Sequence, residues 1–467
     1  MRPSLWRLLA AATVALSAGA AAAPDTPEVT EFELDNGMKV LVRPDRRAPV
    51  VVSQVWYRVG SVDEHRGITG VSHVLEHMMF KGTDDYGPGE MSEIIAVHGG
   101  KENAFTSHDY TAYYQQIAAE HLDLMLQLEA DRMTDLALAP EQFAREVRVV
   151  QEERRQRVED RPRSLTYERL RAAAFPSSPA RTPIIGWRAD LESMTADDVA
   201  RWYRQWYAPN NAALVVVGDV EPARVLELAR EHFGDKQAME LPRRPAPTEV
   251  EPRGETRVRV HAPATLPYLA MGWRVPSLTT VEEPAEVYAL DVLVGILDGG
   301  RSARIETSIV RGSGVASGAG ASYSPISRTE ELLTVGGTPA QGEDVEALEQ
   351  ALRAEVEKLK SGAIGSEELE RVKTNVRARD VFQRDSMFYQ AMRIGMLETV
   401  GLGQDAYAAY REGIDAVTAE DVGRVARRYL TDERLTVARL VPEGVEADGR
   451  RRRGDEGPIG GGDTIVE

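Results

Sequence analysis

A short run of residues that occurs twice constrains the fold of this chain more than any other feature of its sequence. Residues 195–199 read TADDV, and residues 418–422 read TAEDV. In both copies a threonine stands where the N-cap of a helix is expected. In both copies the predicted helix is followed by an apolar strand, at residues 213–217 and at residues 435–441. The recurrence of a helix–strand unit indicates two copies of one domain.

A second pair of similar segments lies earlier in each half. Residues 55–59 read VWYRV and residues 271–275 read MGWRV, so the two similar segments occur in the same order in both halves of the chain. Chance similarity is the alternative explanation, and the shared order favours duplication over it. The total length of 467 residues also fits two or three domains.

Composition marks the boundaries between these domains. Prolines alternate with charged residues in residues 241–254, which predicts an extended linker. We therefore expect a first domain in residues 24–240 and a homologous second domain in residues 255–445. The glycine-rich, charged tail of residues 446–467 is expected to be disordered.

The N-terminus has the order of features found in a secretory signal peptide. Arg2 and Arg7 precede an apolar run and then a stretch of small residues, so residues 1–23 are expected to be removed. A membrane anchor is the alternative, but the apolar run is short for a bilayer span, and no later segment is apolar enough. With no cysteine in the chain, disulfides and thiolate ligands are excluded. We expect a soluble periplasmic or secreted protein with no membrane attachment after cleavage.

The charge of the chain argues against a nucleic-acid partner. The formal net charge is −18, whereas a phosphate backbone requires a basic protein face. An acidic surface is otherwise an ordinary property of a soluble protein.

The strongest chemical signal is the pattern His-x-x-Glu-His formed by His73, Glu76 and His77. Residues four apart lie on one face of a helix, so the two imidazoles can bind one ion. A glutamate beside such an ion can take a proton from an attacking water and pass it to the leaving amine. The pattern is the inverted form of a zinc-peptidase motif. The alternative is a helix with two ordinary histidines, which the scarcity of histidine, 8 in the whole chain, disfavours.

A catalytic zinc ion needs a third protein ligand, and without cysteine a carboxylate is the natural choice. Glu146 and Glu153 lie seven residues apart on a predicted helix and share a face. Glu153 could bind the metal while Glu146 supports the site from behind. The alternative is a solvated charged helix in which these acids pair with Arg154 and Arg155.

These residues resemble the pitrilysin and insulinase family, which includes mitochondrial processing peptidase. The resemblance implies that the third ligand is the second glutamate of the pair seven apart, which is Glu153, with Glu152 as the neighbouring alternative. It covers nearly all of residues 29–443. Further matching segments are FKGT at 80–83, NAFT at 103–106, DYTAY at 109–113, PIIGW at 183–187 and PNNA at 209–212.

The resemblance implies an α+β fold with two homologous domains, each a mainly antiparallel sheet packed with helices. Residues 99–106 would form the edge of the first sheet. An extended peptide can add to such an edge as one more strand, through main-chain hydrogen bonds. Asn103, Ala104 and Phe105 are therefore candidate substrate-binding residues.

The second half is expected to lack a metal site of its own. Its only histidine is His261, and an apolar run replaces the metal helix, so we expect one Zn²⁺ per chain. In the family the second domain supplies an arginine and a tyrosine that hold substrate. Arg311 is the candidate arginine, but Ser317 stands where the tyrosine is expected. The missing group could come from a partner, so we expect a homodimer or a heterodimer with a similar subunit.

Together these observations predict a zinc metalloendopeptidase. His73, His77 and Glu153 would hold the ion, Glu76 would act as the general base, and the substrates would be peptides or unfolded segments in extended form. The alternative is a catalytically silent structural or chaperone-like subunit, which the intact set of residues disfavours. A secreted metal-binding protein without hydrolytic activity is a third reading.

Overall fold

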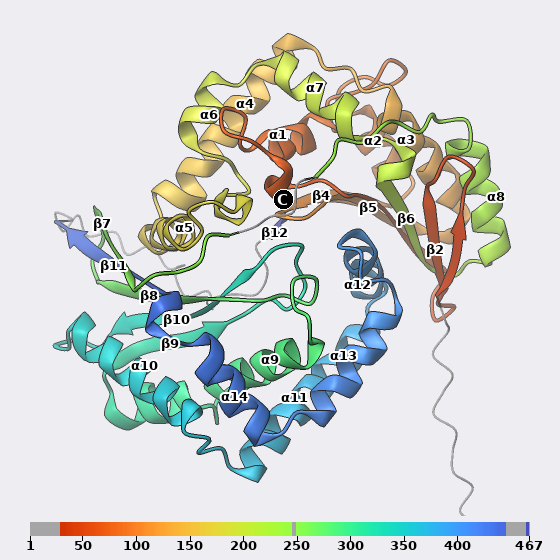
Figure 1. Cartoon of the computed structure of the whole chain (residues 1–467). Helices are drawn as coiled ribbons and strands as arrows, with labels where there is room; N and C mark the ends of the chain where they lie inside the picture. The colour runs from red at the N-terminus through yellow and green to blue at the C-terminus, as the bar shows by residue number, and fades with distance from the viewer. Residues whose placement is uncertain (1–28, 245–248, 445–463, 467) are drawn as a thin grey trace, which may run out of the picture.

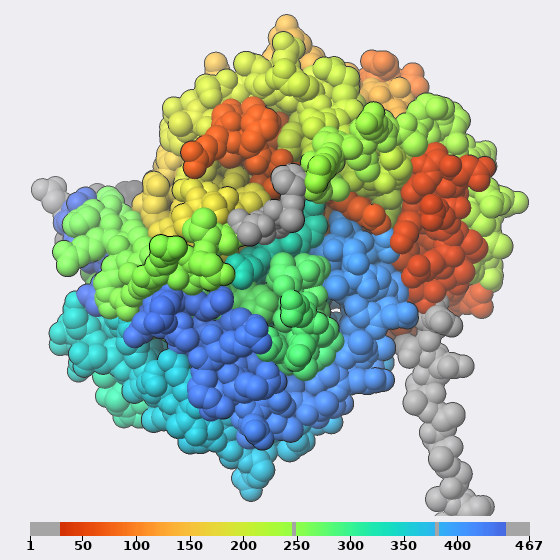
Figure 2. All heavy atoms as spheres, in the orientation of Figure 1, coloured from red at the N-terminus to blue at the C-terminus, as the bar shows by residue number. Residues whose placement is uncertain are grey.

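The computed structural model describes residues 29–244, 249–444 and 464–466. The expected signal peptide lies outside the described residues. Among the residues that are described, no helix combines the length and apolarity that a bilayer span requires. The chain forms two lobes, one from each half of the sequence, which face each other in Figure 1 and meet along a seam in Figure 2.

The first lobe contains a sheet in which only one pair of neighbouring strands is parallel, β2 with β6. Valine-rich β6 lies in the middle of this sheet, and all its residues are buried. The strands in spatial order are β1 (Thr30–Glu33), β2 (Lys39–Pro44), β6 (Ala212–Gly218), β3 (Val50–Tyr57), β5 (Thr111–Ala118), β4 (Lys101–Ser107) and β12 (Thr464–Val466).

The second lobe repeats this arrangement. Its sheet again has one parallel pair, β7 with β11, followed by antiparallel neighbours. The strands in spatial order are β7 (Thr256–Pro263), β11 (Leu435–Glu443), β8 (Tyr268–Val275), β10 (Glu331–Pro339) and β9 (Ala316–Ser322). The order β2-β6-β3-β5-β4 therefore recurs as β7-β11-β8-β10-β9, and the expected α+β fold with two similar domains is confirmed.

Helices cover both sheets. Those of the first half are α1 (Val71–Met78), α2 (Glu90–Val97), α3 (Leu122–Thr134), α4 (Pro140–Arg154), α5 (Pro162–Ala174), α6 (Arg188–Ser193), α7 (Ala196–Trp206) and α8 (Pro222–Phe233). Those of the second half are α9 (Pro284–Asp298), α10 (Val345–Lys360), α11 (Ser366–Arg384), α12 (Met387–Thr399), α13 (Asp405–Ala416) and α14 (Ala419–Tyr429). Short helical turns include η1 (Ser61–Asp63), η3 (Arg155–Glu159) and η6 (Ile305–Ser313).

The two predicted helix starts are real N-caps. The hydroxyl of Thr195 accepts the N–H of Asp198, and that of Thr418 accepts the N–H of Asp421. In each case the aspartate side chain accepts the N–H of the threonine in return, so two otherwise unpaired donors are satisfied. The same local device thus opens α7 and α14, the equivalent helices of the two lobes.

The lobes interlock by exchanging one helix each. Helix α5, from the first half, packs against β7, β8 and β11 of the second sheet. Helix α12, from the second half, packs against β3 and β6 of the first sheet. Gly395 of α12 lies so close to the indole of Trp56 that there is no room for a Cβ. These exchanged helices bury apolar surface between the lobes and hold them in one orientation.

Ion pairs that involve buried carboxylates add to this connection. Arg328 of the second half contacts Asp63 at 2.6 Å and Asp109 at 3.3 Å, both in the first half. Arg58 and Lys39 pair with Glu398 of α12. Each charge is thus offset across the seam, where an unpaired charge would be costly to bury.

The tail differs from the sequence-based expectation. Of residues 446–467, which we expected to be disordered, Thr464–Val466 form β12 and pair antiparallel with β4. The pairing depends on a contact between segments far apart in the sequence, which the composition of the tail does not reveal.

Candidate functional site

Helix α1 carries the His-x-x-Glu-His pattern and is buried along its whole length of 8 residues. The chain enters the helix through Gly70, whose φ of 87° belongs to the left-handed region and whose Cβ would lie 2.7 Å from the carbonyl oxygen of Ile185. The buried carboxylate of Glu64 accepts the N–H groups of Gly70 and Ser72 at 2.7 and 3.0 Å. These contacts pair two backbone N–H groups at the start of a buried helix, where unpaired donors would be costly.

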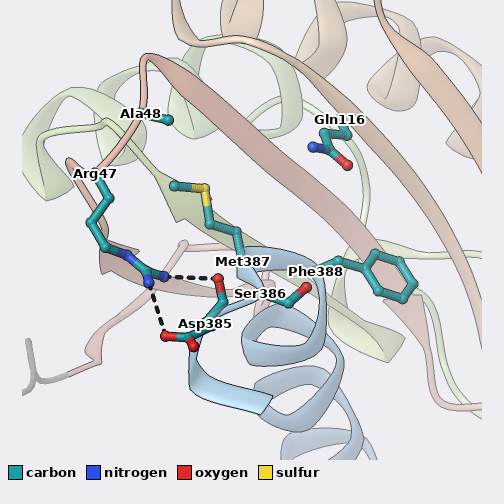
Figure 3. A pocket seen from close by; sticks show the side chains of 7 residues that line it. All are labelled: Arg47, Ala48, Gln116, Asp385, Ser386, Met387 and Phe388. Carbon is teal, nitrogen blue, oxygen red and sulfur yellow. Dashed lines mark hydrogen bonds and ion pairs between the residues drawn. The ribbon is translucent and has the colours of Figure 1, made fainter. Parts of the chain in front are cut away.

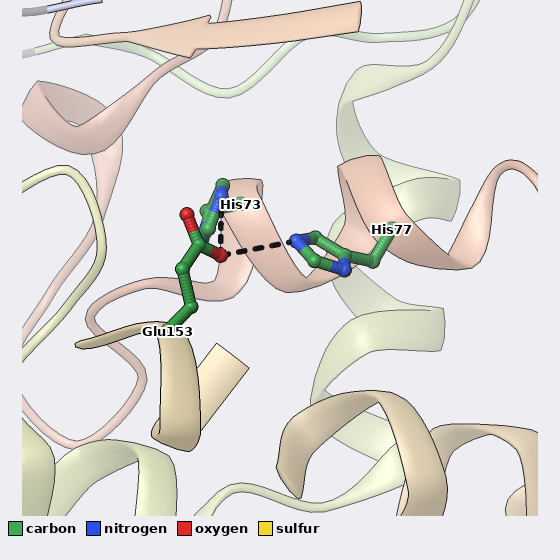
Figure 4. A group of neighbouring side chains, drawn as sticks. All are labelled: His73, His77 and Glu153. Carbon is green, nitrogen blue, oxygen red and sulfur yellow. Dashed lines mark ion pairs between the residues drawn. The ribbon is translucent and has the colours of Figure 1, made fainter. Parts of the chain in front are cut away.

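Glu153 comes to this helix from the C-terminal end of α4, as Figure 4 shows. One of its carboxylate oxygens, Oε2, lies 3.6 Å from Nε2 of His73 and 3.5 Å from Nε2 of His77. These separations are too long for good hydrogen bonds. They match those between ligand atoms that surround a zinc ion tetrahedrally at about 2.0–2.2 Å. His73, His77 and Glu153 form the one group of possible metal ligands found among the described residues.

The protonation state of His73 suits metal binding. Burial and the neighbouring His77 lower the pKa of His73 well below its usual value, so its imidazole is neutral. Neither ring nitrogen of His73 has a hydrogen-bond partner within the described residues. A buried neutral imidazole without such a partner leaves a lone pair available for a cation, and carboxylate and imidazole together fit Zn²⁺.

Glu76 lies between the two histidines in the sequence and is fully buried. Its carboxylate oxygen Oε2 accepts a hydrogen bond from the hydroxyl of Thr106. Thr106 belongs to β4, so this bond connects helix α1, which carries both histidines, with the strand that we expected to bind peptide. It fixes an acidic group beside the histidine–carboxylate cluster.

Two charged residues support the cluster from behind. Glu146 lies 3.5 Å from Nδ1 of His77 and 3.1 Å from Nζ of Lys81. Burial disfavours the charged form of Glu146, but its contacts with His77 and Lys81 hold its pKa below the usual value. Arg157 pairs with the other oxygen of Glu153 at 2.7 Å. Such contacts orient ligands and keep them charged.

The neighbouring acid Glu152 points elsewhere. It is exposed and pairs with Arg155 and Gln156 on the surface of α4. Of the two alternatives left open by spacing, the structure therefore brings Glu153 and not Glu152 to the histidines.

The candidate substrate-binding residues lie on β4 with differing surroundings. Ala104 and Phe105 are buried, and the ring of Phe105 packs edge-on against Trp56 and Tyr110 in the core. The side chain of Asn103 accepts the N–H of Ala104 at 2.8 Å. The side chain of Phe105 thus belongs to the hydrophobic core. A peptide bound at this strand would contact the backbone of Phe105 and not its side chain.

Among the described residues, no hydrogen bond or ion pair joins Arg311 of the second lobe to the histidine–carboxylate cluster. This residue is exposed and pairs with Glu306 at 3.0 Å and with the carbonyl of Arg301. The hydroxyl of Ser317 donates to the carbonyl of Thr338 at 3.3 Å. All these partners lie in the second half, so a substrate contact by Arg311 stays a prediction.

Three residues of the site were missed by the sequence reasoning. Lys81 follows His77 by four positions and Arg157 follows Glu153 by four, so helical spacing could have suggested both contacts. Glu64 contacts the start of α1, but a loop separates it from this helix in the sequence, so no helical spacing indicates the contact.

A separate cavity of about 320 Å³ lies at the seam between the lobes. Figure 3 shows its wall, where Arg47 contacts Asp385 at 3.4 Å. It shares no residue with the histidine–carboxylate cluster. Its lining residues are Arg47, Ala48, Gln116, Asp385, Ser386, Met387 and Phe388.

Comparison with known proteins gives consistent matches along the chain. Residues 39–187 match the family model described as insulinase (peptidase family M16), and residues 193–376 match the peptidase M16 inactive domain. The zinc protease PqqE of Helicobacter pylori is 31% identical over 94% of this chain and 99% of its own length. An uncharacterized zinc protease of Bacillus subtilis, YmxG, is 26% identical over 89% of this chain and 99% of its own.

A solved structure agrees with these matches. The crystal structure of a protease from Helicobacter pylori superimposes with a TM-score of 0.84 at 30% identity, covering 89% of this chain and 100% of that one.

Proposed function

Because the chain belongs to the M16 peptidase family, we propose that it is a zinc-dependent endopeptidase that hydrolyses extended peptides. The observation that carries this proposal is the convergence of His73, His77 and Glu153, with ligand atoms within 4.8 Å of one another. Relatives of similar length are named zinc proteases, which supports zinc as the ion. One ion per chain is expected, because the second half has His261 as its only histidine.

In this proposal His73, His77 and Glu153 would hold Zn²⁺, and Glu146 and Arg157 would keep His77 and Glu153 in place. A bound zinc ion would supply Lewis acidity to water and to the substrate carbonyl. Glu76 accepts a proton from the attacking water and returns it to the nitrogen of the leaving amine. Thr106 holds the Glu76 carboxylate in position for this transfer.

The substrate would bind along β4. Its residues Lys101–Ser107 form the last strand that the first half contributes to the sheet. A peptide added there as a further strand would pass Thr106, which contacts Glu76. Asn103, Ala104 and Phe105 would contribute backbone groups, and recognition would depend little on substrate side chains. Folded substrates could not bind in this way, so flexible segments and peptides are the expected class.

The signal-like N-terminal sequence supports a periplasmic or secreted location. Ser317 stands where a substrate-binding tyrosine is expected. A second copy of this chain, or a homologous subunit, would supply the missing substrate contact. A catalytically silent subunit is the competing reading, and retention of Glu76 together with three possible ligands disfavours it.

Hydrolysis of an internally quenched, unstructured peptide by the wild type and by Glu76→Gln tests the proposal. We expect Glu76→Gln to keep its zinc, measured by mass spectrometry of the metal, and to lose about 10²–10⁴-fold in kcat. Wild-type turnover in this variant, or no turnover in a zinc-loaded wild type, would contradict the proposal.

A further inference from the structure

The edge of β4 at which a substrate would bind is paired in this structure with the chain's own C-terminal segment. Strand β12 (Thr464–Val466) lies antiparallel to β4, with Thr464 opposite Ser107, Ile465 opposite Thr106 and Val466 opposite Phe105. In Figure 1 it lies between the two lobes, beside β4. This short segment thus adds to the sheet as a bound peptide would.

The hydrogen-bonding direction along β4 shows which residue of the tail matters most. The N–H of Ser107 donates to the carbonyl of Tyr110 at 2.8 Å, toward β5. Because successive residues of a strand direct their backbone groups to opposite sides, the N–H and C=O of Thr106 point away from β5. Ile465, opposite Thr106, is therefore the tail residue that pairs with these groups.

The register places the tail at the proposed reaction centre. The hydroxyl of Thr106 donates a hydrogen bond to Glu76, so Ile465 lies opposite a β4 residue that is bonded to the proposed general base. Only one strand can occupy an edge, because neighbouring strands lie about 4.8 Å apart and each backbone group has one partner there. The tail and a substrate peptide cannot both pair with Thr106.

The sequence of the tail is suited to this contact. Ile465 and Val466 are β-branched and favour an extended conformation. A segment tethered to the same chain competes with free substrate at an effective concentration of about millimolar, which compensates for a short strand.

We propose that the C-terminal segment Thr464–Val466 is an intramolecular competitor of substrate, which binds the β4 edge and must leave before a peptide can be cleaved. This inference rests on the proposed function for the site that the tail covers. It does not require that the tail itself be cleaved. Because a saturating substrate displaces a competitor, the tail should raise KM and leave kcat unchanged.

Proline in place of Ile465 tests the pairing in the full-length protein. Ile465→Pro removes the N–H that faces Thr106 and leaves both lobes untouched. Ile459→Pro makes the same exchange at the other isoleucine of the tail, outside β12, and serves as the matched control. We expect Ile465→Pro to lower KM about two- to tenfold at constant kcat, given a millimolar tether and weak strand binding, and Ile459→Pro to behave as the wild type.

Hydrogen–deuterium exchange of the β4 peptide provides a readout that does not depend on catalysis. The amides of residues 101–107 should exchange faster in Ile465→Pro than in the wild type or in Ile459→Pro. A synthetic peptide of residues 460–467 should inhibit Ile465→Pro competitively and restore the protection. If no variant hydrolysed peptide but Ile465→Pro still exposed β4, the proposed function would fail and the docked tail would stand. Unchanged exchange and KM in Ile465→Pro, or equal changes in both proline variants, would overturn the inference.

Discussion

The hydroxyl of Thr106 donates a hydrogen bond to the carboxylate of Glu76 and so joins the strand β4 to the helix α1. Both residues are fully buried. The bond connects the group that we assign to proton transfer with the edge that we assign to peptide binding. Removal of that hydroxyl should affect the chemical step more than the affinity for substrate.

Thr106→Val keeps the shape of the side chain and removes the donor. We expect kcat to fall about tenfold with little change in KM and in zinc content, because a misoriented base transfers protons less efficiently. Steady-state kinetics on a quenched peptide measures both parameters. Thr106→Ser, which keeps the hydroxyl, should retain most of the activity. A loss as large in Thr106→Ser would mean that packing, and not the hydrogen bond, is responsible.

The adjacent acids Glu152 and Glu153 make a matched pair for testing the third ligand. Glu153→Gln should weaken zinc binding by more than about 100-fold, because it removes an anionic ligand from a three-ligand site. Glu152→Gln should bind zinc as the wild type does, since that carboxylate is exposed and pairs with Arg155. Metal content after dialysis against a competing chelator distinguishes the two. Wild-type zinc content in both variants would rule out Glu153 as a ligand.

Substitution of Glu146 tests whether its contact with Nδ1 of His77 contributes to zinc affinity. Glu146→Gln removes the charge that lies 3.5 Å from Nδ1 of the histidine, and we expect zinc affinity to fall about 10–100-fold. Lys81 then loses its partner as well. Glu141→Gln, an exposed acid in the first turn of the same helix, is the control and should leave the affinity unchanged. Titration with a zinc-buffered solution gives the affinities directly.

Glu64 should make stability depend on pH. Burial raises the pKa of this carboxyl from 4.5 to about 7, against the opposing effect of its backbone hydrogen bonds to Gly70 and Ser72. Because the folded-state pKa is higher than the unfolded one, the stabilisation is complete below pH 4.5 and is lost as the pH rises toward 7.

Glu64→Gln imitates the protonated carboxyl and cannot ionise. We expect the stability of the wild type relative to this variant to fall by up to about 3 kcal/mol between pH 4.5 and 7, when both are unfolded by urea. A constant difference across this range would show that Glu64 ionises in the folded state with an ordinary pKa.

Much of the site follows from local sequence patterns. The spacing of His73 and His77 predicts a shared helix face, and the pair Glu146 and Glu153 predicts another, so both sides of the cluster are recognisable before any fold is known. The two threonine N-caps at Thr195 and Thr418 likewise predict helix starts that are confirmed. In each of these cases the interacting groups lie within one or two helical turns.

What the sequence could not reveal depends on contacts between distant segments. The bond between Thr106 and Glu76, the cap provided by Glu64 and the strand at Thr464–Val466 all require knowledge of which elements meet. The exchange of α5 and α12 between the lobes is of the same kind, because an amphipathic helix shows that it is buried but not against which sheet. Spacing alone also left Glu152 and Glu153 undecided, since both occupy one helix and only the packing of α4 against α1 distinguishes them.

The most direct test of the central claim is a crystal structure of the zinc-loaded Glu76→Gln variant with anomalous data collected at the zinc absorption edge. We predict one strong anomalous peak in each chain at about 2.0–2.2 Å from Nε2 of His73, Nε2 of His77 and a carboxylate oxygen of Glu153. A zinc ion bound elsewhere, or no peak among these three side chains in zinc-saturated crystals, would contradict the account.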